Sequence, residues 1–464
     1  MITMENSQYR KSLYKEIMKI GVPSFLETLF TTFAAIIDSK MVSAMGVTAI
    51  SAVSVTNQPR LFIYSIFFAM NTVTTSLVAK YHGRDDQETA NQIFDHTIKL
   101  VLLLGLALSA LAVGLARPIM ILFSGQADTL EGSIVYFRIV MGGMIFNLVF
   151  LEINSALRGF GKTKLTFIDN VLSCVVNLLF NYLLIEGHWG FPAWGIAGAA
   201  VATVLGNIAA CILSLVFVCN RKLFTNIPYC IGKRYHMTKD SLSEILNMTK
   251  SCAVDNVAMR ATLLVISGIT ARIGSFQMAV YSVGNYLLNV NYALGTGLQT
   301  SSVTLIGRSY GEGDYRRLAD YRRAIKKSGM ISAVILSVII MTGGKYFFSF
   351  FSEEEAFVTT GAISCYMIGV ITIFQTLKFI NNGCLQGIGM MKESAFCSIV
   401  SFSCVNLTLV ALTVLVFHWG IWGVWGGTLA GQAVQALMLR HYIAKTPVFS
   451  GNAPETHSGE EKGR

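Results

Sequence analysis

The feature that most constrains this chain is a succession of long apolar stretches separated by short polar segments. A helix needs about 20 mainly apolar residues to cross a hydrocarbon core roughly 30 Å thick. Stretches of this kind occupy residues 17–42, 50–79, 92–116, 130–157, 165–186, 193–219, 243–271, 276–307, 320–344, 356–388, 394–417 and 421–444. The pattern predicts an all-α membrane protein with twelve transmembrane helices.

The composition agrees with a chain surrounded largely by lipid. Of its 464 residues, 53% are hydrophobic and 13% are charged, whereas soluble proteins carry about 25% charged residues. The formal charge of +10 is spread over short clusters between apolar stretches, without a nucleic-acid-binding motif, so we expect no nucleic-acid partner. The nine cysteines include no CxxC pair and are interpreted as small apolar side chains, not metal ligands.

Basic residues fall mainly in alternate loops, which predicts the orientation of the chain in the membrane. Lys80 and Arg84, Lys162 and Lys164, and the basic segment 220–242 lie on one side, whereas the other side carries the acidic run 353–355. Because Lys and Arg are enriched in cytoplasmic loops, we expect both termini to be cytoplasmic and the protein to lie in the plasma membrane. Residues 446–464 are polar and are predicted to form a disordered cytoplasmic tail.

The sequence also contains an internal repeat. Residues 155–164 (SALRGFGKTK) resemble residues 383–392 (GCLQGIGMMK), 228 positions later. Further matches pair Gly46 with Gly274, Asn57 with Asn285, Gly83 with Gly311, His188-Trp189-Gly190 with His418-Trp419-Gly420, and Gly195/Gly198 with Gly423/Gly426. They predict two pseudo-symmetric six-helix bundles, 1–219 and 243–445, joined by a cytoplasmic linker at 220–242. Since each bundle has an even number of spans, the repeats are expected to be parallel.

Two bundles that enclose a cavity near the middle of the membrane suit alternating access, and therefore secondary transport of small organic molecules. The chain contains no Walker motif, so we do not expect it to draw energy from ATP by itself.

Several motifs resemble the MATE (multidrug and toxic compound extrusion) transporters over about residues 10–445. They are DSKMVSAMGVTAISAVSVTNQP, ALRGFGKTK, NLLFNYLLI followed by GIAGAAVAT, and IGRSYGEGDYRRLADY. The resemblance implies a V-shaped pair of six-helix bundles that exports organic, often cationic, compounds in exchange for Na⁺ or H⁺. It implies no other cofactor.

Charged residues within the predicted spans need an explanation, since each costs at least about 2.5 kcal/mol near the bilayer centre. Glu27 and Asp38 lie on the first span, on one helical stripe and about 16 Å apart. By resemblance, Asp38 belongs to a cation-coupling site with Asn177, Asn181 and Thr203. The family often has Asp at position 181, so the Asn here should weaken Na⁺ binding, and both H⁺ and Na⁺ remain open. Alternatively, Asp38 pairs with Lys40 or Arg60.

Glu27 and Asp255 occupy equivalent positions in the two repeats, 228 residues apart. We predict that they face each other across the substrate cleft and attract cationic substrates. In the alternative interpretation, Arg260 or Lys378 neutralises Asp255. Asn57 and its mate Asn285 are predicted cleft residues, or else contacts between helices.

Two further acids, Glu152 and Asp169, are predicted to be neutralised by Lys162, Lys164 and Arg158. No metal site is expected beyond a Na⁺ site at Asp38, Asn177, Asn181 and Thr203.

The main alternative function is that of a flippase for lipid-linked precursors, with cationic residues such as Arg138, Arg260 and Lys378 holding phosphate. A membrane enzyme is disfavoured because the seven histidines are scattered, and a channel because no filter-like segment stands out. We expect a monomer whose partners are small organic cations and membrane lipid.

Overall fold

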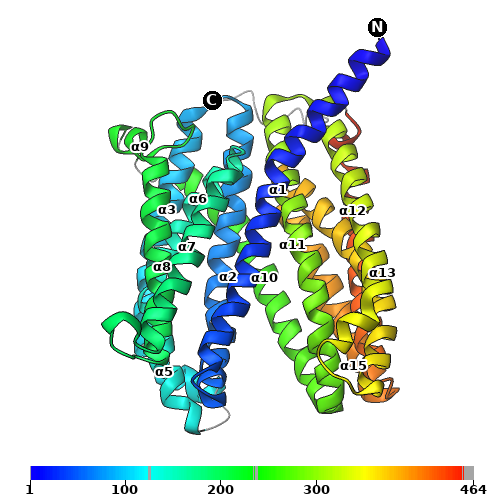
Figure 1. Cartoon of the computed structure of the whole chain (residues 1–464). Coiled ribbons are helices and arrows are strands. Elements are labelled where there is room, and N and C mark those ends of the chain that lie inside the picture. The colour runs from blue at the N-terminus through cyan, green and yellow to red at the C-terminus, as the bar shows by residue number, and fades with distance from the viewer. Residues whose placement is uncertain (1, 124–126, 234, 236–238, 452, 454–464) are drawn as a thin grey trace. The chain divides into compact units, whose positions relative to one another are not determined.

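The computed structural model describes residues 2–123, 127–233, 235, 239–451 and 453. Every regular element in these ranges is a helix (Figure 1). The first part of the chain forms α1 (Ile2–Ser43), α2 (Val47–Gly83), α3 (Gln87–Gly114), α4 (Ala116–Phe123), α5 (Ala127–Gly142), α6 (Met144–Gly159), α7 (Thr163–Ile185), η1 (His188–Gly190), α8 (Ile196–Val218) and α9 (Ile227–Lys233). The rest forms α10 (Lys239–Ile273), α11 (Ser275–Glu312), α12 (Tyr315–Ser349), α13 (Glu355–Gly387), α14 (Met391–Ser398), η2 (Ile399–Asn406), α15 (Leu407–Ala411), η3 (Leu412–Val416), α16 (Ile421–Lys445) and η4 (Pro447–Ser450).

Within the described residues, nine helices are long and apolar enough to cross a membrane. The number rises to ten if α5 and α6, which are bent by 47° relative to each other, make one span. The helices α11 and α16 are 38 and 25 residues long but are not among these nine or ten. The protein is therefore a multi-pass membrane protein, whereas the count of twelve spans remains a prediction.

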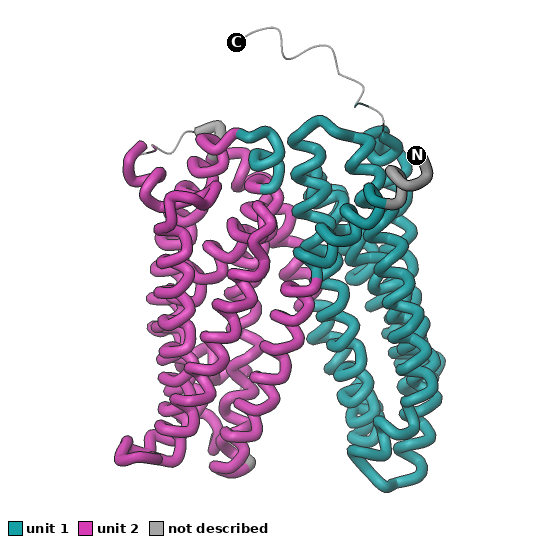
Figure 2. Tube along the Cα trace, turned by 45° about the horizontal axis from the view of Figure 1, so that its top comes forward, with its two compact units in different colours: residues 1–21, 79–85, 261–464 teal, residues 22–78, 86–260 magenta. Residues whose placement is uncertain are grey.

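The chain divides into two compact units (Figure 2). Unit 1 comprises Met1–Gly21, Ala79–Asp85 and Ala261–Arg464, and unit 2 comprises Val22–Val78 and Asp86–Arg260. This division differs from the predicted one at 220–242, because α1, α2 and α10 each contribute to both units. The first part of α1 belongs to unit 1 through direct contacts: Ser301 Oγ donates to the Ile17 carbonyl at 3.3 Å, and Arg317 pairs with Glu16 at 3.3 Å.

Each unit has its own apolar core. In unit 1, Trp425 is fully buried among side chains of α11, α13 and α16, including Val283 and Ile368. In unit 2, Phe94 and Leu157 are buried where α3 and α6 meet. Burial of apolar surface stabilises such packing by about 25 cal/mol per Å² only where the same surface would otherwise be exposed to water. Within lipid, close contact between the helices has to supply the stabilisation instead.

The repeat is visible in the backbone where helices begin. The N-cap residues of α3 and α12, Asp86 and Asp314, lie 228 positions apart and have φ/ψ of −90°/81° and −88°/78°. Each carboxylate accepts a hydrogen bond from the backbone N–H three residues later, at 2.9 and 3.0 Å. The residues before them, Asp85 and Gly313, both have positive φ, 56° and 72°. The two halves therefore use the same turn at equivalent places.

Part of the predicted repeat alignment is wrong. The caps of α8 and α16 are Gly195 and Gly420, with φ/ψ of 54°/−125° and 56°/−135°. A tryptophan precedes each cap, and its backbone N–H donates to a carbonyl of an earlier helix. Trp194 donates to Leu184, and Trp419 donates to Thr413. Gly195 and Gly198 thus correspond to Gly420 and Gly423, and the loop before α16 is shorter than the loop before α8. Matching His188-Trp189-Gly190 to His418-Trp419-Gly420 ignored this difference in length.

The equivalent glycines Gly83 and Gly311 mark a close helix contact inside unit 1. A Cβ at Gly83 would lie 2.0 Å from the Arg308 carbonyl oxygen, and one at Gly311 would lie 1.9 Å from the Lys80 carbonyl oxygen. Only glycine leaves room for the two backbones at this distance.

The chain after α16 is ordered further than predicted. Residues 447–450 form η4, and Val448 and Phe449 are buried against Leu439 and Ile443. Arg322 donates to the Phe449 carbonyl at 3.2 Å and lies over its ring. The two apolar side chains explain the order, because they add to the core of unit 1. The rest of the predicted tail, from residue 454, lies outside the described residues.

Residues 224–233 of the predicted linker 220–242 pack on α3 within unit 2. Asn91 donates to the Phe224 carbonyl at 2.9 Å and accepts from the Asn226 N–H at 2.8 Å. At its exposed end, Lys233 pairs with Glu88 at 3.1 Å, and this hydrogen bond raises the pKa of Lys233. The segment is therefore attached to its own unit.

Candidate functional site

The four residues predicted to couple a cation come together in unit 2, from α1, α7 and α8. The Asn181 amide donates to the Asp38 carboxylate, and its Nδ2 lies 3.4 Å from Asn177 Oδ1. Asn177 Nδ2 in turn lies 3.4 Å from Thr203 Oγ1, and the Thr203 hydroxyl donates to the Ala199 carbonyl at 3.0 Å. One carboxylate, two amides and one hydroxyl thus form a continuous polar cluster.

Local packing explains why α7 and α8 bring these side chains together. Asn177 and Asn181 are one turn apart and therefore share a face of α7. Opposite them, α8 has Gly206, where an added Cβ would lie 2.7 Å from the Ser173 carbonyl oxygen and 3.0 Å from Asn177 Cβ. The absence of a side chain at Gly206 lets α8 approach, and Thr203 lies one turn away on the same helix.

The alternative interpretation of Asp38 does not hold in this structure. In the described part of the chain, Asp38 forms no ion pair with Lys40 or Arg60. Arg60 instead donates to Asn57 Oδ1 at 2.8 Å, although its charge still acts on Asp38. Asp38 is half-buried, whereas Asn181 is fully buried and its Oδ1 has no hydrogen-bond partner among the described residues. Oxygen donors of this kind can hold a proton on the carboxylate or a hard cation.

Glu27 is not a free carboxylate. It is buried, with 7% exposure, and forms an ion pair with Arg158 of α6. Thr166 Oγ1 and Asn170 Nδ2, both on α7, donate to its two oxygens at 2.9 Å each. Glu27 is therefore poorly suited to attract a cationic substrate in this state, because Arg158 already compensates its negative charge.

The predicted partners of Glu152 and Asp169 were also wrong. Arg158 pairs with Glu27, while the fully buried Glu152 accepts a hydrogen bond from Thr74 at 2.6 Å. Asp169 is fully buried too, and neither of its oxygens has a hydrogen-bond partner in the ranges the structure describes.

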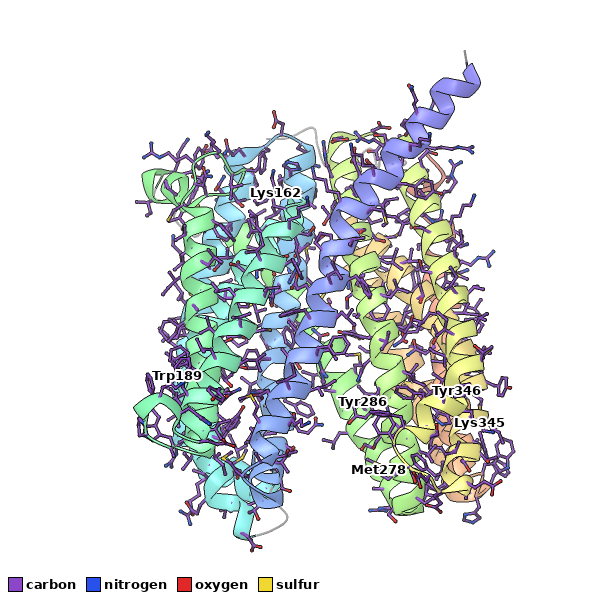
Figure 3. The ribbon with its side chains drawn as sticks, viewed as in Figure 1. Lys162, Trp189, Met278, Tyr286, Lys345 and Tyr346 are labelled. Atoms are coloured by element: carbon purple, nitrogen blue, oxygen red, sulfur yellow. The ribbon has the colours of Figure 1, made fainter. Side chains whose placement is uncertain are left out.

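Lys162 precedes α7 and Trp189 follows it, so these two residues mark opposite ends of the helix (Figure 3).

The other predicted cleft residues do not gather into a site within either unit. Asp255 is half-buried on α10, one turn beyond Cys252, whose thiol is affected by its charge. Asn57 accepts from Arg60 on its own helix, and Asn285 donates to the Tyr281 carbonyl on its own helix at 2.8 Å. Neither bond joins two helices. The participation of Asp255, Asn57 and Asn285 in substrate binding remains a prediction.

A polar face of α7 that sequence reasoning missed links the two carboxylates of α1. Thr166, Asn170, Asn177 and Asn181 follow one another at spacings of four, seven and four residues, which places them on one side of the helix. The first two bond Glu27 and the last bonds Asp38. This spacing was visible in the sequence, and so was the eleven-residue spacing of the two acids.

The described residues of unit 1 bury neutral polar groups but no acid. The buried Asn291 of α11 donates to Gln375 Oε1 of α13 at 2.7 Å and accepts from Thr376 Oγ1 at 3.0 Å. Lys378, three residues after Gln375, lies over the rings of Phe379 and Phe402 at 4.7 and 5.6 Å. Among the residues described, no group of three or more His, Cys, Asp or Glu side chains is placed to hold a metal ion.

These features define the class of protein. Multiple apolar helices, an internal duplication and a carboxylate–amide cluster inside one helical unit are typical of membrane transporters built from repeats. The MatE family model matches residues 23–183 and again 252–412, which together make more than half of the chain. The chain therefore belongs to the MATE family of transporters and is not an enzyme. The two matched segments are offset by 229 residues, in agreement with the internal repeat.

Individual relatives are similar over almost the whole length. The "Probable multidrug resistance protein NorM" of Thermotoga maritima is 22% identical over 417 residues, covering 90% of this chain and 89% of its own. The "Multidrug export protein MepA" of Staphylococcus saprophyticus is 20% identical, with 84% and 85% covered. A solved structure described as "Crystal structure of MATE in complex with MaL6" has a TM-score of 0.86 at 19% identity and covers 93% of this chain and 96% of that one. At this identity, the structural likeness concerns the fold alone.

Proposed function

We propose that this chain is an antiporter that exports organic, drug-like compounds in exchange for H⁺ bound at Asp38. The observation that carries the proposal is the contact of the Asp38 carboxylate with Asn181, in a cluster with Asn177 and Thr203. A carboxylate inside a helical unit can change its charge during transport, while the surrounding amides and hydroxyl stabilise either form. The names of the NorM and MepA relatives support multidrug export.

The contact pattern favours H⁺ over Na⁺. The Asn181 NH₂ group donates to Asp38, so the carboxylate already accepts a hydrogen bond from its neighbour. The cluster also has a single carboxylate, because position 181 is Asn. A site for a hard cation would gain from oxygens that all face the ion. Na⁺ would require the Asn181 amide to turn.

Substrates are proposed to be cationic, with Asp255 as a contact. Glu27 is left out of this part of the proposal because it forms an ion pair with Arg158. The alternative function is that of a flippase for lipid-linked precursors, in which cationic residues such as Arg138, Arg260 and Lys378 would hold phosphate.

Proteoliposomes test these points together. A fluorescent organic cation is offered under a pH gradient alone and under a Na⁺ gradient alone, with a fluorescent anion and a fluorescent lipid as matched probes. We expect accumulation of the cation under the pH gradient and not under the Na⁺ gradient. Accumulation under neither gradient, or movement of the lipid probe alone, would contradict the antiporter proposal.

The proposed topology has twelve spans, with α11 and α16 among them, both termini in the cytoplasm, and a monomer in the plasma membrane. It is supported by the basic residues of alternate loops, such as Lys162. Fusion of a reporter that fluoresces only in the cytoplasm should give signal at either terminus. A signal at one terminus alone would require an odd number of spans.

A further inference from the structure

The strongest unexplained feature outside the Asp38 cluster is Asp169 on α7. Its side chain is fully buried, and both carboxylate oxygens lack a hydrogen-bond partner among the residues that the structure describes. Buried polar groups are nearly always hydrogen-bonded, and an ionised carboxylate can accept several such bonds. A buried carboxylate left without any of them is therefore an exception that needs a cause.

The groups around Asp169 leave its charge uncompensated. From α1, Glu27 lies close enough for the two acids to interact electrostatically. From α6, Arg158 faces Glu27, and Glu152 is turned to Thr74 of α2.

From α8, the neighbouring titratable group is the buried thiol of Cys211, which packs with Phe150 and Ala210 in an apolar cluster. Among the described residues, Arg158 is thus already paired with Glu27, and the charge that acts on Asp169 is that of another acid.

Burial of a second negative charge in such a place is unfavourable. Binding of a proton removes the charge and turns one oxygen into an O–H donor. The group formed by Glu27, Arg158 and protonated Asp169 is then neutral overall, and the ion pair remains intact.

The location connects this group with the Asp38 cluster. Asp169 directly precedes Asn170, which bonds Glu27, and the same polar face of α7 reaches Asp38 through Asn181. Glu27 and Asp38 are separated by eleven residues of α1, about 16 Å. Asp169 and Asp38 therefore lie near the two ends of one polar contact between α1 and α7, within a single unit.

We propose that Asp169 is a second proton-binding site of this transporter, held beside the Glu27–Arg158 ion pair, and that its proton takes part in the exchange together with that of Asp38. The proton enters from water and returns to water, without any covalent step. This inference rests on the proposed H⁺ antiport.

The first test is infrared difference spectroscopy on the purified full-length protein, which requires no transport. At neutral pH, subtraction of the Asp169→Asn spectrum from that of the wild type should leave the carbonyl band of a protonated carboxylic acid, because the amide keeps the size and neutrality of the protonated acid but lacks this band. Any band of the buried Glu152 cancels in the subtraction. The same band should remain in Asp38→Asn. Asp169→Ser serves as a second variant if the first does not fold. A difference spectrum without this band overturns the proposal.

The second test counts protons per substrate from the reversal potential of transport in proteoliposomes. We expect Asp169→Asn to transport with a count lower by about one proton, because a permanently neutral amide cannot release one. An unchanged count overturns the inference while leaving the antiporter intact. Loss of pH-driven transport in the wild type would instead refute the proposed function, whatever the spectra show.

Discussion

The two units share a scaffold but differ in the chemistry of their interiors. In unit 2, three acids are buried, Glu27, Glu152 and Asp169, and Asp38 is half-buried beside Asn181. The described residues of unit 1 include no buried acid, and the interior bonds of Asn291 with Gln375 and Thr376 involve neutral groups. Duplication has preserved the caps of α3 and α12, whereas buried acids occur, among the described residues, in unit 2 only. We therefore expect ion exchange to depend on unit 2 and the amide network of unit 1 to be structural.

The largest expected effect is that of Asp38→Asn on transport. Because the amide cannot change its charge, uptake of a fluorescent cation driven by a pH gradient should fall to the background of empty liposomes. The matched control is Gln375→Leu in unit 1, which should retain most of the uptake. If the two variants lose uptake equally, the difference between the units has no functional meaning.

Arg158→Gln should cause the largest loss of stability. It leaves Glu27 buried without a counter-charge, and removing one partner of a buried pair costs about 3–5 kcal/mol. The double variant Glu27→Gln/Arg158→Gln should recover most of this loss, because no charge remains unpaired. Thermal unfolding in detergent measures both. Equal melting temperatures for the single and double variants would mean that the ion pair is not formed.

A smaller effect is expected for Asn291→Leu in unit 1. The variant leaves the Gln375 oxygen and the Thr376 hydroxyl without a partner, which costs about 1–3 kcal/mol. Its melting temperature should fall, while the number of protons exchanged per substrate stays as in the wild type. A changed proton count would show that unit 1 takes part in the exchange.

The smallest effect is expected at the equivalent caps. Asp86→Ala and Asp314→Ala each remove the side-chain bond to a backbone N–H in the first turn of a helix, a loss of about 1 kcal/mol. Because the two caps have the same backbone geometry, both variants should lose stability. The loss should be somewhat larger for Asp86→Ala, since Asp86 also accepts from Thr89 Oγ1 at 2.6 Å. Melting temperatures of the single variants, with the exposed Glu131→Ala as a control, test this. A clearly larger loss for Asp314→Ala would indicate that the repeats are not equivalent even in their scaffold.

The sequence predicted the helical class, the duplication and the grouping of Asp38 with Asn177, Asn181 and Thr203. These depend on apolar length, on repeated motifs and on resemblance to a family.

The bond between Glu27 and Arg158 was missed because the two residues are separated by 131 positions and no periodicity connects α1 with α6. Lys162 and Lys164 were assigned to Asp169 through nearness in sequence, yet its side chain points into the helical unit. The repeat of His188-Trp189-Gly190 was misaligned because two equivalent loops differ in length. The apolar pair Val448 and Phe449 was a signal for η4 that the polar composition around it concealed.

The most direct test of the central claim is the release of protons when substrate is added to the purified protein in weakly buffered detergent solution. We expect release from the wild type and from Gln375→Leu in equal amounts. In Asp38→Asn the release should fall to about half or less, because Asp38 is one of two proposed proton sites in unit 2. Equal release from Asp38→Asn and the wild type would contradict the account.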